Sequence, residues 1–294
     1  MERFFKLSQS NTTVGIELGA GLTTFMAMAY IAFVNPQMMA SAGMDQGAAF
    51  VATCIAAALA CFFMGLYANW PVGLAPGMGL NAFFTYTIVG DMGYPWETAL
   101  GAVFIAGILF VILTVTRLRE WMLISIPWNL RIAMGAGIGL FVGMIGLRNG
   151  GLIVDHPATL LSLGNFQITE TLLAALGFLI ITGLATRRFP GAILLGILAV
   201  TAVGLGVGVV QYQGVVSAPP PIAPVLGKLD IAAALDVAMM SAIASLLFVN
   251  LFDTAGTLVG VATQTGLTKA DGTIENLDRA LKADSASSVA GALV

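Results

Sequence analysis

Apolar runs of about 20 residues recur along the whole chain, and they constrain its fold more than any other feature. A helix of that length crosses the hydrocarbon core of a bilayer, because each residue adds about 1.5 Å along the helix axis. Only 9% of the 294 residues are charged, against roughly 25% in a soluble domain. The sequence therefore predicts an all-α, polytopic membrane protein that passes repeatedly through the lipid bilayer of the cell (inner or plasma) membrane.

Eight complete spans are expected from these runs. They cover residues 14–34, 47–67, 73–90, 97–116, 130–148, 169–186, 190–210 and 236–262. A ninth span begins near Ser285 and is cut at Val294, so we expect the sequence to be the N-terminal part of a longer protein. In the polar connector 263–287, the helical spacing of Ile274, Leu277 and Leu281 predicts a short surface helix.

The distribution of basic residues predicts a cytoplasmic N-terminus. With odd-numbered spans running outward, Arg148 and Lys228 lie outside, and all other basic residues lie inside. The inner set is Arg3, Lys6, Arg117, Arg119, Arg131, Arg187, Arg188, Lys269, Arg279 and Lys282. This orientation makes the proline-rich connector at 211–235 extracellular and the connector at 263–287 cytoplasmic.

Several kinds of chemistry are not expected. Cys54 and Cys61 lie roughly 10 Å apart along one helix, which is too far for a disulfide. His156 is the only histidine and lies in a polar connector as a plain loop residue, so no metal is expected. Neither a phosphate-binding G-x-x-x-x-G-K-[ST] loop nor a nucleophile–base pair is present, so we expect no enzyme, no cofactor and no nucleic-acid partner. Secondary transport or a channel remains.

The segment "GLAPGMGLNAFF" at 73–84 interrupts the third apolar run with glycines, a proline and Asn81. Irregular backbone is tolerated at membrane depth only where it faces protein or a wet cavity. Such a break commonly marks the binding site of a transporter, and a helix starting after Leu80 would point its N-terminal end at it. Asn81 would offer a donor and an acceptor there. The alternative is a kinked or re-entrant segment in which Asn81 bonds a neighbouring helix.

Asp253, in "LLFVNLFDTAGTLVG", is the only acidic residue deep inside an apolar run. A carboxylate in hydrocarbon is costly, so it should face a polar cavity or find partners. This pattern indicates a substrate or proton site. The alternative is a structural carboxylate that caps a broken helix or bonds Asn250 or Thr254.

Glycines four residues apart recur in four runs, and on a helix they form a smooth face that another backbone can approach closely. They are Gly15 and Gly19; Gly135, Gly139 and Gly143; Gly204 and Gly208; and Gly256 and Gly260. This spacing predicts tight helix packing but no function.

Three stretches carry a resemblance to a known family. "VGIELGAGLTTFMAMAYIAFVNPQMM", "GLAPGMGLNAFFTYT" and "FVNLFDTAGTLVG" resemble the nucleobase–cation symporter (xanthine/uracil permease) superfamily, in its AzgA-like branch. The resemblance implies a purine nucleobase:proton symporter for adenine, guanine or hypoxanthine. It also implies fourteen spans in two inverted seven-span repeats, with a part-strand third span, so that this chain is truncated in the ninth span.

The resemblance also implies a division into two domains. Residues 1–116 would be core-domain spans one to four, and 117–210 gate-domain spans five to seven. Residues 211–235 would be the extracellular connector. Residues 236–294 would be core-domain span eight, a cytoplasmic loop and the start of span nine. A homodimer is among the assemblies that this architecture allows.

Within the two motifs, the family's asparagine matches Asn81 and its aspartate matches Asp253. The resemblance therefore implies that both bind the purine and that Asp253 couples transport to the proton. Phe83 or Phe84 would stack on the base, with Gly79 and Thr254 beside the two polar residues. An anion carrier of the same architecture remains an alternative, although a buried Asp253 argues against it. A channel is the other alternative, although no filter sequence is found.

Overall fold

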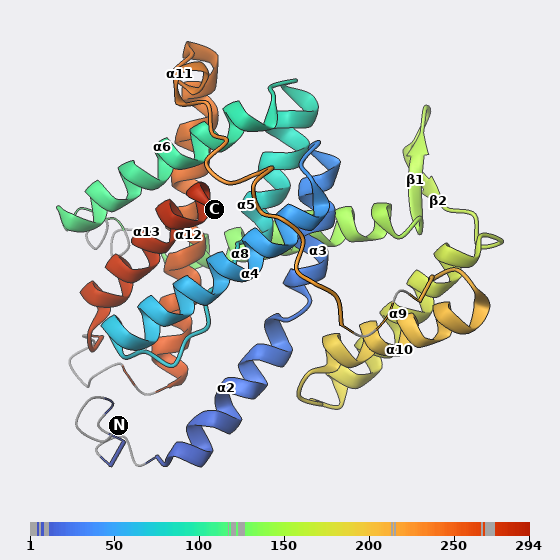
Figure 1. The fold of residues 1–294 in the computed structure, drawn as a ribbon, viewed down its shortest axis with the longest axis horizontal. Coiled ribbons are helices and arrows are strands. Elements are labelled where there is room, and N and C mark those ends of the chain that lie inside the picture. The colour runs from blue at the N-terminus through green and yellow to red at the C-terminus, as the bar shows by residue number, and fades with distance from the viewer. Residues whose placement is uncertain are drawn as a thin grey trace. The chain divides into compact units, whose positions relative to one another are not determined.

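The computed structural model describes residues 5, 7–8, 12–116, 118, 122, 127–212, 214, 216–265, 267 and 274–294 (Figure 1). Within these residues the chain is mostly helical, and five stretches are long and apolar enough to cross a membrane. They are Val14–Ser41, Gln46–Ala68, Trp96–Val115, Thr169–Thr186 and Val237–Thr254. The protein is therefore a polytopic membrane protein, as predicted. Arg3, Lys6, Arg117, Arg119 and Lys269 lie outside the described residues, and the orientation stays a prediction.

Contacts divide the chain into two compact units. The first consists of Met1–Tyr30 and Leu140–Ala218, and the second of Ile31–Gly139 and Pro219–Val294. The predicted division at residues 116, 210 and 235 follows spans and function and is not the same kind of division as these contact units. The functional division into core and gate stays a prediction.

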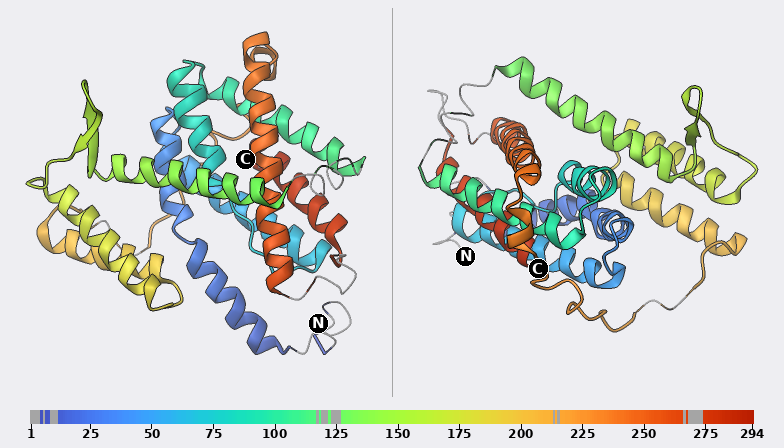
Figure 2. Two further views of the ribbon diagram at one scale, coloured as in Figure 1. Left: turned by 180° about the vertical axis from the view of Figure 1, so that it is seen from behind. Right: turned by 90° about the horizontal axis from the view of Figure 1, so that it is seen from above.

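The first unit is built on a pair of antiparallel helices, α9 (Thr169–Thr186) and α10 (Ala192–Val207), which lie side by side in both views of Figure 2. Gly177 of α9 faces Val200, and Gly196 of α10 faces Ile181. Helix α2 (Val14–Met28) contacts α10, and α8 (Trp128–Asn149) enters this unit with its second half.

A β-hairpin lies between α8 and α9, where the sequence analysis expected only a loop. Strands β1 (Ile153–His156) and β2 (Leu160–Leu163) pair antiparallel, so the chain is not purely α-helical. β-branched and leucine residues on either side of a proline-containing turn favour a hairpin, but runs of four residues are too short to show a period. His156 ends β1, and its Nδ1 accepts hydrogen bonds from the turn.

The second unit holds the other helices. Their order is α3 (Ile31–Ser41), α4 (Gln46–Phe63), the π-helix η1 (Met64–Ala68), α5 (Met78–Ala82), the π-helix η2 (Phe83–Asp91), α6 (Trp96–Val115), α11 (Ile231–Ala234), α12 (Val237–Gln264) and α13 (Leu277–Leu293). Most predicted spans match these bounds within a few residues. The first span differs, because it breaks at Ala29–Tyr30 and its second helix continues through Pro36 to Ser41.

Helix α13 corrects the prediction for the end of the chain. A short surface helix and a separate span from Ser285 were expected, but the structure has one continuous helix, Leu277–Leu293. Its first turns already carry buried Ala280 and Leu281, so they belong to the core. The helix packs on α4, η1 and α6 (Figure 1), and the Ser285 hydroxyl lies 2.7 Å from the Thr114 hydroxyl of α6.

Two hydrophobic clusters hold the second unit together, and α12 contributes to both. One joins η1, α6, α12 and α13, and there the Trp70 indole donates to the carbonyl oxygen of Glu275 at 2.9 Å. The other joins η2, α6, α11 and α12. Beside it, the Tyr94 phenol donates to Asp236 at 3.1 Å, and this bond raises the pKa of Tyr94 because it stabilises the neutral phenol.

The glycine pattern predicted close packing at mostly the wrong positions. A Cβ built at Gly15, Gly19, Gly139, Gly143 or Gly260 would meet no atom within 4 Å, whereas one at Gly204 would press on Val210. Gly208 instead ends α10 with a φ of +80°. The surroundings of Gly135 and Gly256 lie outside the described part. The spacing shows that glycines share a face, but it does not show which faces meet a neighbour.

Close helix packing occurs at Gly101 of α6, which suggests a test. A Cβ at Gly101 would overlap the carbonyl oxygen of Asp230, a backbone atom that cannot turn away. We expect Gly101→Ala to destabilise the detergent-solubilised protein by about 1–3 kcal/mol. Gly260→Ala is the matched control, because its Cβ meets open space and alanine favours a helix by up to about 1 kcal/mol. Equal thermal unfolding midpoints for the two variants would contradict this packing.

Candidate functional site

The third predicted span is broken, as its glycines and proline indicated. Asn69 ends η1 in the left-handed region with a φ of +54°, and the chain stays non-helical until α5 begins at Met78. The helix thus begins before the expected start after Leu80. The part-strand that the resemblance implied is not formed in this segment. Instead the backbone of Leu74 bonds the Cys61 thiol, which lies 3.3 Å from its nitrogen and 3.2 Å from its oxygen.

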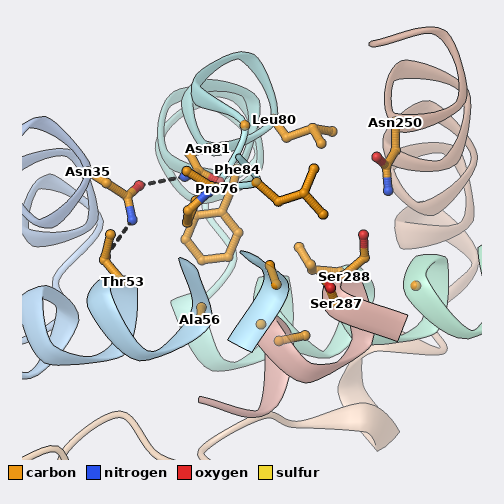
Figure 3. Close-up of a pocket in the computed structure, with 18 of the residues that line it drawn as sticks. Asn35, Thr53, Ala56, Pro76, Leu80, Asn81, Phe84, Asn250, Ser287 and Ser288 are labelled. Carbon is orange, nitrogen blue, oxygen red and sulfur yellow. Dashed lines mark hydrogen bonds between the residues drawn. The ribbon is translucent and has the colours of Figure 1, made fainter. Parts of the chain in front are cut away.

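A cavity of about 380 Å³ lies beside this segment, within the second unit (Figure 3). Residues 72–77 line it together with side chains from α3, α4, α5, η2, α6, α12 and α13. Ligand pockets of proteins have volumes of about 300–1,000 Å³. Its polar side chains are those of Asn35, Thr53, Asn81, Asn250, Asp253, Thr254, Thr257, Asp284, Ser287 and Ser288. The cavity is therefore large enough for a small ligand and rich in hydrogen-bonding groups.

A chain of hydrogen bonds holds Asn81 at one side of the cavity. Its Nδ2 donates to Oδ1 of Asn35, whose own Nδ2 donates to the Thr53 hydroxyl at 2.8 Å. Thr53 in turn donates to the carbonyl oxygen of Ala49 at 2.6 Å. Asn35 and Thr53 are buried, so the network fixes the orientation of the Asn81 amide and leaves its Oδ1 free for other partners.

Two carboxylates from different helices face the cavity. Asp253 of α12 lies against the broken segment, because a Cβ built at Gly77 would be 3.5 Å from its Oδ2. Asp284 of α13 accepts a hydrogen bond from Thr254 at 3.3 Å and lines the same cavity as Asp253. Ligand N–H groups bound to such carboxylates form charge-assisted hydrogen bonds, which are roughly twice as strong as neutral ones.

The structure brings together four of the six predicted site residues. Asn81, Phe84, Asp253 and Thr254 line the cavity. Phe83 and Gly79 are not among its lining residues, and Phe83 packs against the second hydrophobic cluster. Adjacent residues of a helix point in different directions, which explains why Phe84 faces the cavity and Phe83 does not. Purine binding by the four lining residues stays a prediction.

Sequence reasoning missed other polar residues around the cavity. Asn35 is an amide within the apolar run "IAFVNPQMM", and this position is the signal in the sequence that indicates it. Asp284 was assigned to a polar connector, because the buried face of α13 was not recognised. Asn250 was considered only as a partner of Asp253, yet within the described part of the chain no hydrogen bond joins these two side chains.

Long apolar helices beside a polar cavity, with one helix broken at that cavity, are typical of membrane transporters that bind their substrate inside the membrane. The model of the Permease family matches residues 15–294. The chain belongs to the xanthine/uracil permease family, and its relatives place it in the AzgA-like branch.

The adenine permease AdeP of Escherichia coli is 47% identical over 294 residues, which are 100% of this chain and 66% of that protein. The guanine/hypoxanthine permease PbuG of Bacillus subtilis is 41% identical over 306 residues, covering 100% of this chain and 69% of that protein. The guanine/hypoxanthine permease GhxP of Escherichia coli O157:H7 is 37% identical over 301 residues, which cover 100% of this chain and 67% of that protein. The chain thus spans about two thirds of the length of these permeases, which are transporters rather than enzymes.

The asparagine network yields a stability test. Asn35→Ala removes the acceptor of Asn81 and leaves polar groups of Asn81 and Thr53 unpaired, which we expect to cost about 1–3 kcal/mol. The measurement is thermal unfolding of the purified protein in detergent. Gln37→Ala is the control, because this amide lies on the same helix but is exposed. An equal effect of both substitutions on the unfolding midpoint would show that the network contributes nothing to stability.

Proposed function

We propose that the protein is a secondary active transporter that carries a purine nucleobase into the cell together with a proton. The observation that carries this proposal is the meeting of Asn81 and Asp253 at one cavity, although they lie far apart in the sequence. The substrates named for its relatives, adenine and guanine/hypoxanthine, support the purine class.

The chemistry of the cavity suits a purine. A purine has a flat ring system, and Phe84 supplies an aromatic face within the described lining. The edges of the base carry N–H donors and nitrogen or oxygen acceptors. Asp253 can accept from a ring N–H, and Asn81 keeps its Oδ1 and a second N–H for the base.

An anion carrier of the same architecture is not favoured. The described residues around the cavity include Asp253 and Asp284 but no lysine, arginine or histidine. An anion would meet two carboxylates there without a compensating positive charge, which is unfavourable at low dielectric.

The proposal includes the finer architecture that the family resemblance implies. We infer two inverted seven-span repeats, a cytoplasmic N-terminus and a location in the cell membrane. The excess of basic residues in alternate connectors supports this orientation. Helices α5 and α12, which Figure 1 labels, both belong to the second unit, and the resemblance implies that the third and eighth spans lie together in the core domain.

Substitution of Asn81 tests the substrate site. If its Oδ1 or free N–H contacts the base, Asn81→Ala should weaken purine affinity by about 1–3 kcal/mol, or roughly 5- to 150-fold. The measurement is the concentration dependence of radiolabelled hypoxanthine and adenine uptake by the intact transporter, with surface abundance measured alongside. Unchanged affinity at normal abundance would assign Asn81 a purely structural role beside Asn35.

Substitution of Asp253 tests the coupling to protons. Asp253→Asn keeps the shape of the side chain but cannot exchange a proton, so we expect accumulation driven by a pH gradient to disappear while exchange of purines persists. Asp278→Asn is the control, because that carboxylate is exposed and pairs with Lys282 on the surface of α13. Concentrative uptake by Asp253→Asn that a protonophore still abolishes would mean that another group carries the proton.

A further inference from the structure

The hydroxyl groups around the cavity already donate their single proton to the protein. Their acceptors are backbone oxygens or Asp284. Thr53 donates to Ala49, Thr257 to Asp253, Ser287 to Ala283 and Ser288 to Asp284, all at main-chain oxygens, and Thr254 donates to the Asp284 carboxylate. A hydroxyl carries only one proton, so in this arrangement these groups can only accept from a ligand.

The amides around the cavity are not equivalent. Asn35 and Asn81 each use their Nδ2 inside the network with Thr53. Asn250 of α12 makes no hydrogen bond to any described residue, although its side chain is half-buried and lines the cavity. Figure 3 shows it across the cavity from the Asn35–Asn81 pair. Among the amides of the described lining, Asn250 is therefore the one whose two N–H donors and carbonyl acceptor make no hydrogen bond within the described part of the protein.

Asn250 and Asp253 face the same ligand space. They lie three residues apart on α12, about 4.5 Å along the helix axis, which puts them on one face of the helix. A flat base in its N7–H tautomer can thus give this ring N–H to Asp253 and present the adjacent substituent on C6 to Asn250. A ring N–H is common to all purine bases, so the Asp253 carboxylate cannot distinguish one purine from another.

Purine bases differ at the substituent on C6. Adenine carries an amino group there, which donates, whereas hypoxanthine and guanine carry a carbonyl oxygen, which accepts. An asparagine amide can serve either, with Oδ1 toward the amino group or Nδ2 toward the carbonyl. A group that can only accept, such as a carboxylate or the committed hydroxyls, would serve the amino group alone.

We propose that Asn250 binds the C6 substituent of the purine and so determines the preference between 6-amino and 6-oxo bases. This inference rests on the proposed function, since it requires a purine in the cavity. Asn250 then acts as a specificity-determining residue opposite the Asn81 network. Asp253 accepts the ring N–H and so fixes the position of the base between Asn250 and Asn81.

The test is equilibrium binding of radiolabelled adenine and hypoxanthine to the purified, intact transporter. The pH is alkaline, so that the carboxyl group introduced by Asn250→Asp is ionised and carries no donor. Asn250→Asp keeps the acceptor and removes both donors, so we expect adenine affinity to be retained and hypoxanthine affinity to fall about tenfold or more. Asn250→Leu, of similar size, removes both functions and should weaken the binding of both bases about tenfold. Ser241→Ala is the control, because this exposed serine of α12 bonds only its own helix.

The outcomes are distinguishable. An unchanged ratio of adenine to hypoxanthine affinity in a folded Asn250→Asp variant would overturn the inference about Asn250. It would not contradict the proposal that the protein transports purines. If Asn250→Asp does not fold, wild-type affinities for both bases in Asn250→Leu would overturn it equally. If the wild-type protein binds neither base, the proposed function fails, and the inference fails with it.

Discussion

The rest of the second unit depends on how the protein accommodates non-helical backbone at membrane depth. Between η1 and α5 the chain is not helical over residues 69–77. Lipid could not satisfy the polar groups of such a segment. Protein groups do so instead. The Cys61 thiol bonds both polar groups of Leu74, and the neighbouring Trp70 is anchored to Glu275. These contacts place α4 and the residue Glu275, just before α13, beside the break, and residues of the break, α4 and α13 line the cavity.

Long apolar helices were predictable because length and hydrophobicity alone specify them. The bounds of α6, α9 and α12 agree with the prediction within a few residues, and so does the presence of the break before α5. The hairpin at 153–163 was not predictable, since four-residue strands show no period. The continuous α13 was missed because its polar residues suggested a surface connector, while its small residues Ala280 and Ala283 are buried against the core.

The site was only half predictable for a similar physical reason. Asp253 and Asn81 stood out because a polar group in an apolar run is costly and needs a reason. Asn35 also lies in an apolar run, whereas Asp284 lies in a polar stretch of the sequence. The contacts of both depend on partners that are remote in sequence, Thr53 and Asn81 for Asn35 and Thr254 for Asp284. The choice between Phe83 and Phe84 depended on the rotation of η2, which neither residue type reveals.

The cavity thus has two sides with different physical character. On the Asn81 side, buried Asn35 and Thr53 fix the amide before any ligand arrives, so binding there costs little ordering entropy. On the α12 side, Asn250 keeps an uncommitted amide that can present either its donor or its acceptor. A fixed side suits features that all substrates share, and an adaptable side suits the feature in which they differ. Under the proposed function, one cavity can therefore serve both 6-amino and 6-oxo purines, with the preference between them set at a single face of α12.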